Sequence, residues 1–452
     1  MAERGIDPGS FNPDRFERGS MSTLQIADGA VLAADMSVRS ADVLADRETG
    51  RIVEVGDTAR GDEILDADSG LVIPGLVNAH CHVAMTLLRG YADDKPLDAW
   101  LREDIWPTET ELETDDIVAG TRLGAVELLK NGVTALGDMY FEVPESAAAL
   151  AEAGLRARVG HGIVTVGKEE VTARADFETG LDVARELDGA FDGRIATALM
   201  PHSLTTAAAD LLAEYVPRAR EAGIPLHYHA NETRDEVEPI VEERGVRPLE
   251  YADELGMLEE GDFIAHGVHT DRTEIELLAE RGVGVAHCPA SNMKLASGIA
   301  PVQELLDAGV TVGIGTDGAA SNNDLDAFDE LRDAAMVGKL KADDASAVSA
   351  PEVVRAATAG GADLLGFDSG RIEPGALADL AVIDLEAAHL TPAHDLVSHL
   401  AYAVRGSDVR HTVVDGDVIV RDREILTLDE AAVRREAERH AESLIARAES
   451  NR

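Results

Sequence analysis

The chain has 452 residues, of which 45% are hydrophobic and 28% charged, as in a globular protein, and no apolar run approaches the roughly 20 residues that cross a bilayer. Its 40 basic and 86 acidic residues give a net charge of −46, which argues against nucleic acid as a partner. Only six of the basic residues are lysines, a balance typical of a halophile's cytoplasmic protein that needs molar salt for screening. Two widely separated cysteines, Cys81 and Cys288, exclude a disulfide scaffold or a zinc ribbon.

The two ends of the chain have a similar sequence pattern. Short β-rich segments separated by Asp and Gly turns occupy residues 22–74 and again 371–425, as small antiparallel strands require. We expect these ends to pair into one small sheet domain. Residues 1–21 lack the apolar core of a signal peptide and are expected to form a flexible extension. Residues 426–452 are expected to form a C-terminal helix.

Between these ends, residues 75–370 alternate short apolar segments with longer ones whose apolar residues recur every three or four positions. Eight such alternations, with strands buried on both faces, predict an α/β fold with a (β/α)8 TIM barrel. A doubly wound open sheet shows the same alternation and is the alternative. The expected barrel strands are residues 76–78, 133–138, 157–163, 194–201, 225–230, 262–268, 283–288 and 310–317.

A His-Cys-His motif, His80 to His82, directly follows the first expected barrel strand. Residues i and i+2 of an extended backbone point to the same side, so both imidazoles can face one ion. Such a pair is weak evidence alone. It gains weight because the carboxyl ends of barrel strands meet on one face, and further histidines and carboxylates, of the types that bind metals, lie at or just after the ends of other expected strands. These are His227, His229, Glu232, His266, His269, His287 and Asp317.

Several segments resemble the amidohydrolase superfamily, most closely its haloarchaeal-type 5′-methylthioadenosine/S-adenosylhomocysteine deaminases. They are PGLVNAHCHVAMTLLRGYADD, HYHANE, IAHGVH, CPASNMKL and GIGTDGAASNN, and the similarity runs from about residue 22 to residue 421. The resemblance implies a (β/α)8 barrel with a small β-sandwich built from both ends of the chain. It also implies that His80, His82, His229 and Asp317 bind one divalent metal ion per subunit, usually Zn²⁺, with Fe²⁺ and Mn²⁺ as alternatives.

The same resemblance points to three catalytic residues. Glu232 lies three positions after His229, so its carboxyl group can reach an atom beside the ion and deliver a proton to a ring nitrogen. His266 is expected to hold or deprotonate the attacking water, and Asp317 to take a proton from it. His227 precedes His229 by two residues, and we expect it to support the site or to pack.

Substrate contacts are also implied by the resemblance. Trp100 is expected to form an aromatic wall for the purine, and Glu109 to bind the ribose hydroxyls by charge-assisted hydrogen bonds. A role as a helix core anchor is the alternative for Trp100. His202, at the end of the fourth strand, matches a substrate-contacting histidine of the family. For Ser291 and Asn292, loop capping and a direct role remain equal alternatives.

One segment departs from the family pattern. Family members that accept S-adenosylhomocysteine have arginines after the third strand for the amino-acid carboxylate, but His161 stands at the first of these positions. Arg174 is a candidate for the second. A bidentate guanidinium is not replaced conservatively by another side chain. We therefore expect His161 at the substrate's 5′ substituent, with preference shifted toward methylthioadenosine, 5′-deoxyadenosine or adenosine.

These observations predict a metal-dependent hydrolytic deaminase that converts the 6-amino group of an adenine nucleoside to a 6-oxo group and releases ammonia. A sister activity on a free base or a triazine, such as guanine or cytosine deamination or dechlorination, is the enzymatic alternative. A non-catalytic scaffold is the second alternative. The expected partner is a small-molecule nucleoside, without nucleic acid or membrane, and the acidic surface neither requires nor forbids a homo-oligomer.

Overall fold

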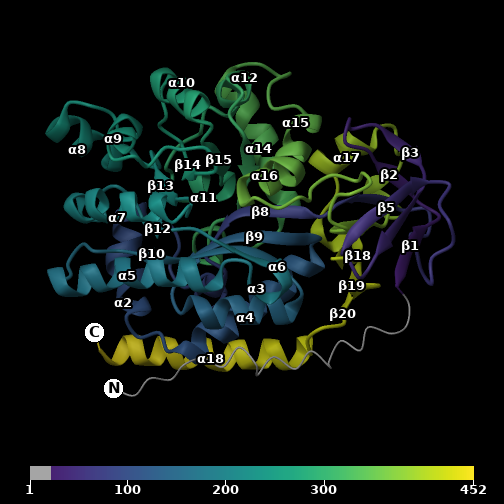
Figure 1. Ribbon diagram of the computed structural model, residues 1–452, viewed down its shortest axis with the longest axis horizontal. Coiled ribbons are helices and arrows are strands. Elements are labelled where there is room, and N and C mark those ends of the chain that lie inside the picture. Colours follow the sequence, from purple (N-terminus) through teal and green to yellow (C-terminus); the bar gives the residue numbers. More distant parts are fainter. Residues whose placement is uncertain (1–21, 452) are drawn as a thin grey trace.

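The computed structural model describes residues 22–451, so the extension expected for residues 1–21 lies outside the described residues. An α/β barrel and a separate β-sheet domain lie side by side, with the barrel on the left of Figure 1 and the sheets on the right. None of the helices in this part of the chain combines the length and the apolar character that a membrane crossing demands.

Parallel strands form the barrel in two consecutive runs. The first run is β8 (Leu76–Cys81), β9 (Val133–Tyr140), β10 (Arg156–Ile163), β11 (Ile195–Thr197) and β12 (Met200–Pro201). The second run is β13 (His227–Ala230), β14 (Phe263–His266), β15 (Gly284–His287) and β16 (Val312–Ile314). Backbone hydrogen bonds join the runs into a ring, from His227 N to Leu199 O at 3.1 Å and from Asp317 N to His80 O at 3.0 Å. The expected closed barrel is therefore confirmed over the doubly wound sheet.

Some strands are shorter than the sequence indicated, because the backbone turns at the site itself. The fourth expected strand is divided into β11 and β12. His266 ends β14 with φ 73°, and Asp317 follows β16 with φ 61°. Left-handed backbone is uncommon for residues other than glycine and does not continue a strand. These bends lie beside the residues expected to act on the substrate.

Helices surround the barrel and connect its strands. The first half has α3 (Thr114–Lys130), α4 (Val143–Ala153), α5 (Glu170–Leu187), α6 (Ala190–Gly193) and α7 (Ala209–Glu221). The second half has α8 (Arg234–Arg244), α9 (Pro248–Glu254), α10 (Arg272–Arg281), α11 (Pro289–Lys294), α12 (Val302–Asp307), α13 (Ala319–Asn322), α14 (Ala327–Ala342), α15 (Ala350–Arg355) and α16 (Gly361–Leu365). After β8, a 3-10 turn (Val83–Leu88) leads to α1 (Leu97–Trp100) and α2 (Trp106–Glu109), which border the site.

The sheet domain is built from both ends of the chain, as expected. One sheet has the order β5-β4-β1-β6 and the other β20-β19-β18-β17-β7-β2-β3. The N-terminal and C-terminal parts of the chain meet in the second sheet, through the antiparallel pair of β7 (Leu71–Pro74) and β17 (Leu380–Ile383). The remaining strands are β1 (Thr23–Ala27), β2 (Ala30–Leu32), β3 (Val38–Ser40), β4 (Asp42–Asp46), β5 (Arg51–Gly56), β6 (Glu63–Asp66), β18 (Val409–Val414), β19 (Asp417–Arg421) and β20 (Glu424–Ile425). The helix α17 (Leu396–Tyr402) lies between β17 and β18 in the sequence.

The C-terminal helix α18 (Glu430–Ser450) runs back from the sheets along the barrel, in yellow at the bottom of Figure 1. Its His440 Nδ1 lies 2.7 Å from Asp116 Oδ1 of α3, and Arg447 pairs with the other oxygen of Asp116. Leu444 is fully buried in a cluster that includes Trp100. The last helix therefore packs against the elements that border the site.

Candidate active site

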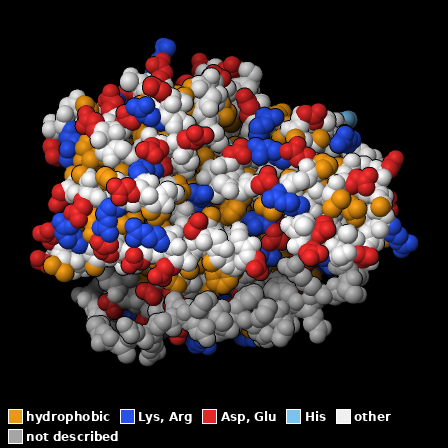
Figure 2. All heavy atoms as spheres, viewed as in Figure 1, with side chains coloured by type: hydrophobic (Ala, Val, Ile, Leu, Met, Phe, Trp, Pro, Cys, Tyr) orange, Lys and Arg blue, Asp and Glu red, His pale blue; other side chains and the backbone are white. Residues whose placement is uncertain are grey.

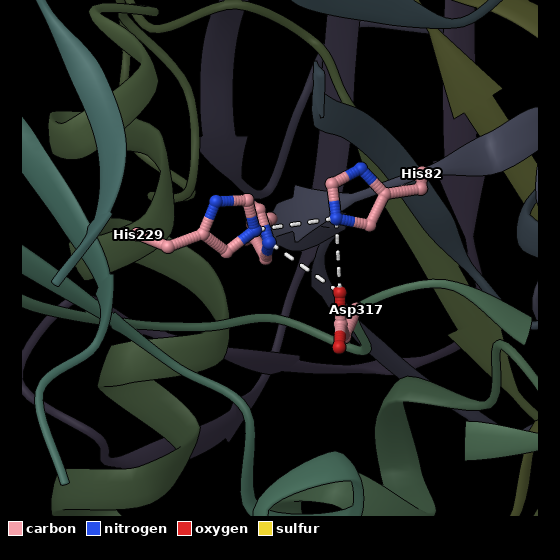
Figure 3. A group of neighbouring side chains, drawn as sticks. His82, His229 and Asp317 are labelled. Atoms are coloured by element: carbon pink, nitrogen blue, oxygen red, sulfur yellow. Dashed lines mark hydrogen bonds and ion pairs between the residues drawn. The ribbon is translucent and has the colours of Figure 1, made fainter. Parts of the chain in front are cut away.

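Four side chains from distant parts of the sequence meet at the carboxyl ends of the barrel strands. His80, His82, His229 and Asp317 each place one ligand atom within 4.8 Å of the others. His82 Nε2 lies 3.2 Å from Asp317 Oδ1 and 3.3 Å from His229 Nε2, as Figure 3 shows. His80 Nε2 lies 3.5 Å from Asp317 Oδ1. The structure thus brings together all four residues that the resemblance implied as metal ligands.

Each histidine of this group has its Nδ1 engaged on the side away from the centre. A neutral imidazole carries one proton, so donation from Nδ1 leaves the lone pair of Nε2 facing the other ligands. The Nδ1 partners are His227 Nε2 for His80 at 2.8 Å, the Met139 carbonyl for His82 at 2.6 Å, and the His202 carbonyl for His229 at 2.7 Å. Moreover, the buried His80 Nε2 makes no hydrogen bond within residues 22–451. This arrangement fits a divalent metal ion.

Asp317 is held with one oxygen toward the histidines. Its Oδ2 accepts hydrogen bonds from Ser291 Oγ at 2.6 Å and Ser321 Oγ at 2.7 Å, which leaves Oδ1 for the centre. Burial alone raises the pKa of Asp317, but His80 and His82 outweigh it and hold the pKa well below its usual range. Asp317 is therefore held as a carboxylate. Ser291, for which loop capping and a direct role were equal alternatives, contacts Asp317 by this bond.

Glu232 and His266 lie beside the four ligands. Glu232 Oε2 is 3.8 Å from His266 Nε2, and His266 Nδ1 is 2.9 Å from Asn292 Oδ1. Burial raises the pKa of Glu232, although the neighbouring His266 lowers it. A carboxyl group with a raised pKa keeps its proton closer to neutral pH and can act as a general acid. Asn292, for which the sequence left loop capping and a direct role as equal alternatives, holds the His266 ring through this hydrogen bond.

A cavity of about 340 Å³ opens over this group. Its lining includes His82, His229 and Asp317 together with Glu232 and His266, while the fully buried His80 does not border it. Its walls are largely apolar and aromatic, and a few convergent polar groups on an apolar wall are typical of sites for small organic ligands. The apolar and aromatic wall residues are Met85, Leu97, Trp100, Leu101, Trp106, Met139, Tyr140, Phe141, Gly162, Val164 and Val166.

Trp100 and Glu109 both border the cavity, as expected. Trp100 is 5% exposed, and its indole nitrogen donates to the Ala92 carbonyl at 3.0 Å, so it is a core anchor and a cavity wall at once. Glu109 accepts a hydrogen bond from the Tyr140 hydroxyl at 2.8 Å. Burial raises the pKa of Glu109 to about 7, while the bond from Tyr140 opposes this shift. Glu109 thus offers a carboxyl group that titrates near neutral pH.

The structure places His202 in the cavity wall but does not bring His161 there. The His202 ring lies 4.5 Å from the ring of His229, and burial lowers the pKa of His202 to about 3, so it is neutral.

On β10, Gly162 lines the cavity, and successive strand residues face opposite sides. The His161 ring instead lies 6.0 Å from that of Phe141. Arg174 pairs with acidic residues of α5 and α7.

Sequence reasoning missed Lys168, which the structure places in the cavity wall after β10. Among the described residues that border this cavity, Lys168 is the one cation, and it pairs with Asp176. It belongs to no motif. The scarcity of lysine in the chain was the one signal that could have drawn attention to it.

Comparisons with known proteins agree with this site. The model of the amidohydrolase family matches residues 71–419. A 5-methylthioadenosine/S-adenosylhomocysteine deaminase of Natronomonas pharaonis is 78% identical over 431 residues, covering 95% of this chain and 100% of the relative. A 5′-deoxyadenosine deaminase of Methanosarcina mazei is 42% identical over 405 residues, covering 89% and 94%. The crystal structure of a Xanthomonas campestris adenosine deaminase with bound zinc has a TM-score of 0.88 and 36% identity, covering 94% and 98%. The chain belongs to the amidohydrolase family.

Proposed function

We propose that this protein is a metal-dependent hydrolytic deaminase of adenine nucleosides. It replaces the 6-amino group of the purine by oxygen, consuming one water molecule and releasing ammonia. The observation that carries the proposal is the cluster of three Nε2-presenting histidines and Asp317, of which His82, His229 and Asp317 line the cavity beside Glu232. The names of the relatives, which are deaminases of adenosine derivatives, support the substrate class.

We infer that His80, His82, His229 and Asp317 hold one divalent ion, and zinc is the ion we expect because the similar Xanthomonas campestris structure contains it. Imidazole nitrogen and carboxylate oxygen are ordinary zinc ligands. When bound, the ion supplies Lewis-acid activation of a water molecule. The proton transfers of the reaction are carried out by side chains of this protein.

Glu232 gives its proton to N1 of the purine, and this makes C6 electrophilic. His266, fixed by Asn292, takes a proton from the attacking water as the new C6–O bond forms. The C6–N bond then breaks, and the amino group leaves as ammonia with one of the two water protons. The other water proton returns to Glu232, while the proton first given stays on N1 of the 6-oxo product.

Glu109 and Trp100 favour a ribosylated substrate over a free base. The Glu109 carboxylate accepts hydrogen bonds from the two ribose hydroxyls, and charge-assisted bonds of this kind are strong. Trp100 gives the purine a flat apolar wall. A free base or a triazine offers Glu109 no hydroxyl pair, so the sister activities leave this buried carboxyl group with the Tyr140 hydroxyl as its partner.

A spectrophotometric assay in buffer with molar KCl and zinc tests the proposal. We expect turnover of methylthioadenosine, S-adenosylhomocysteine, 5′-deoxyadenosine or adenosine, and none of adenine, guanine, cytosine or aminotriazines. Glu232→Gln is the matched control, because it keeps the size of the side chain but not its proton chemistry. It should retain its metal and lose about 10²- to 10⁴-fold in kcat. Turnover confined to free bases or triazines would contradict the proposed substrate class.

A further inference from the structure

The turn after β13 carries Glu232 into the cavity through an uncommon backbone. Asn231 has φ 55°, in the left-handed region, and Thr233 is extended just before α8 begins at Arg234. Asn adopts this conformation more readily than most residues with a Cβ atom, and here contacts from neighbouring elements hold the turn in one arrangement. The position of the Glu232 side chain therefore depends on what holds this turn.

Two acidic side chains hold the turn from different elements. Glu274 of α10 is fully buried and accepts a hydrogen bond from Asn231 Nδ2 at 2.9 Å. Glu236 of α8 accepts a hydrogen bond at Oε2 from the backbone N–H of Glu232, also at 2.9 Å. His269 N donates to the Asn231 carbonyl at 2.8 Å. Of the two acidic side chains, Glu236 alone accepts a hydrogen bond from the main chain of Glu232.

Ordinary helix capping does not account for the Glu236 contact. Thr233 accepts a hydrogen bond from Glu236 N at 3.2 Å, which is one half of a capping box. The other half is normally a bond from the N-cap residue's own N–H to the glutamate. In α15 it is made in that way, from Ser349 N to Glu352 Oε2 at 2.7 Å. In α8, Glu236 reaches one residue further back, to Glu232.

The surroundings of Glu236 are also unlike those of a surface cap. Its Oε1 is buried and has no hydrogen-bond partner in the described part of the chain. Glu236 and Glu232 together border a second cavity that adjoins the first at His202 and His229. Burial raises the pKa of Glu236 to about 8, and the charges of Glu232 and Glu274 add to this shift. The raised pKa therefore disfavours a second negative charge beside Glu232.

We propose that Glu236 is a positioning residue for Glu232: its carboxyl oxygen fixes the main chain of the turn so that the Glu232 carboxyl group faces the reacting end of the cavity. The proposal rests on the role proposed above for Glu232. It predicts that the acceptor oxygen of residue 236 matters for kcat, while the charge of the side chain does not.

Two substitutions separate this role from helix capping. Glu236→Gln keeps an oxygen of the same reach and should retain kcat within about threefold. Glu236→Ala removes the oxygen and should lower kcat about 10- to 100-fold with little change in KM, since a small misplacement of a catalytic group has such an effect. Metal content, measured by mass spectrometry, should be unchanged in both. If Glu236→Ala does not fold, Glu236→Met removes the oxygens and keeps the length.

Glu352→Ala is the matched control, because it removes the capping glutamate of α15. It should lower the melting temperature and leave kcat unchanged. A Glu236→Ala enzyme with wild-type kcat and only a lower melting temperature would overturn the proposal, as would equal losses in the Ala and Gln variants. The kcat of each variant is compared with that of the wild type on whichever compound the wild type converts. An error in the proposed substrate class therefore does not affect this comparison and is detected by the substrate assay. If the wild type converts none, a crystal structure of Glu236→Ala with Glu232 still in place overturns the proposal.

Discussion

His80 Nδ1 lies 2.8 Å from His227 Nε2, and His227 Nδ1 lies 3.0 Å from the Phe263 carbonyl. The carbonyl oxygen can only accept, so His227 donates from Nδ1 and accepts at Nε2. His80 must then donate from Nδ1. Burial lowers the pKa of His80 to about 4 and that of His227 well below its usual range, so both rings are neutral. The chain of bonds fixes the tautomer of His80, a proposed metal ligand, and His227 holds that residue through a hydrogen bond.

Replacing His227 by Phe should weaken metal binding. Phe keeps an aromatic ring beside Phe263 but removes the acceptor for His80, which then loses its fixed tautomer. Loss of such a supporting hydrogen bond lowers metal affinity about 10- to 100-fold. Competition with a zinc chelator measures the change. His411→Phe, at an equally buried histidine in the sheet domain, should keep wild-type affinity. Unchanged affinity in His227→Phe would contradict this role.

The KM for nucleosides should depend on pH through Glu109. Because burial raises the pKa of this carboxyl group to about 7, it is protonated below that pH and ionised above it. The ionised form accepts hydrogen bonds from the ribose hydroxyls more strongly. The KM for methylthioadenosine should therefore rise as the pH falls from 8 to 6. Glu109→Gln should have a higher KM that no longer changes over this range. A wild-type KM that is flat with pH would refute the assignment.

Lys168 should favour substrates whose 5′ substituent carries a carboxylate. It is the cation of the cavity wall, and a charge-assisted hydrogen bond to a carboxylate contributes about 1.5 to 3 kcal/mol. Lys168→Met should lower kcat/KM about tenfold for S-adenosylhomocysteine and leave 5′-deoxyadenosine unaffected. Arg174→Met is the control, because Arg174 does not border the cavity. A loss shared equally by both substrates would count against a carboxylate contact.

The stability of the fold should depend strongly on salt. Acidic side chains are dispersed over the face of the molecule shown in Figure 2, and the net charge of −46 implies mutual repulsion between them. Molar salt shortens the screening length to about 3 Å and weakens this repulsion. The melting temperature should therefore be higher in 2 M KCl than in 0.1 M KCl. Equal melting temperatures at the two concentrations would contradict a halophilic adaptation.

Local patterns in the sequence predicted the fold, and the family resemblance implied the ligand group. Strand and helix periodicities arise from backbone geometry, so they indicated the barrel. The two-residue spacing of His80 and His82 indicated that both side chains could face one metal ion. The reach of Glu232 followed from its position after His229. The same reasoning misplaced the ends of several strands. It could not foresee that His266 and Asp317 adopt left-handed backbone, which depends on neighbours elsewhere in the chain.

The sequence by itself determined the alternation of strands and helices and the strand ends at which the histidines gather, because these depend on residues close together in the chain. Only the tertiary structure decided which nitrogen each histidine presents, that Lys168 rather than His161 borders the cavity, and that Glu236 reaches the main chain of Glu232. Those features are contacts whose geometry is set by the packing of whole elements, and no spacing along the chain specifies them.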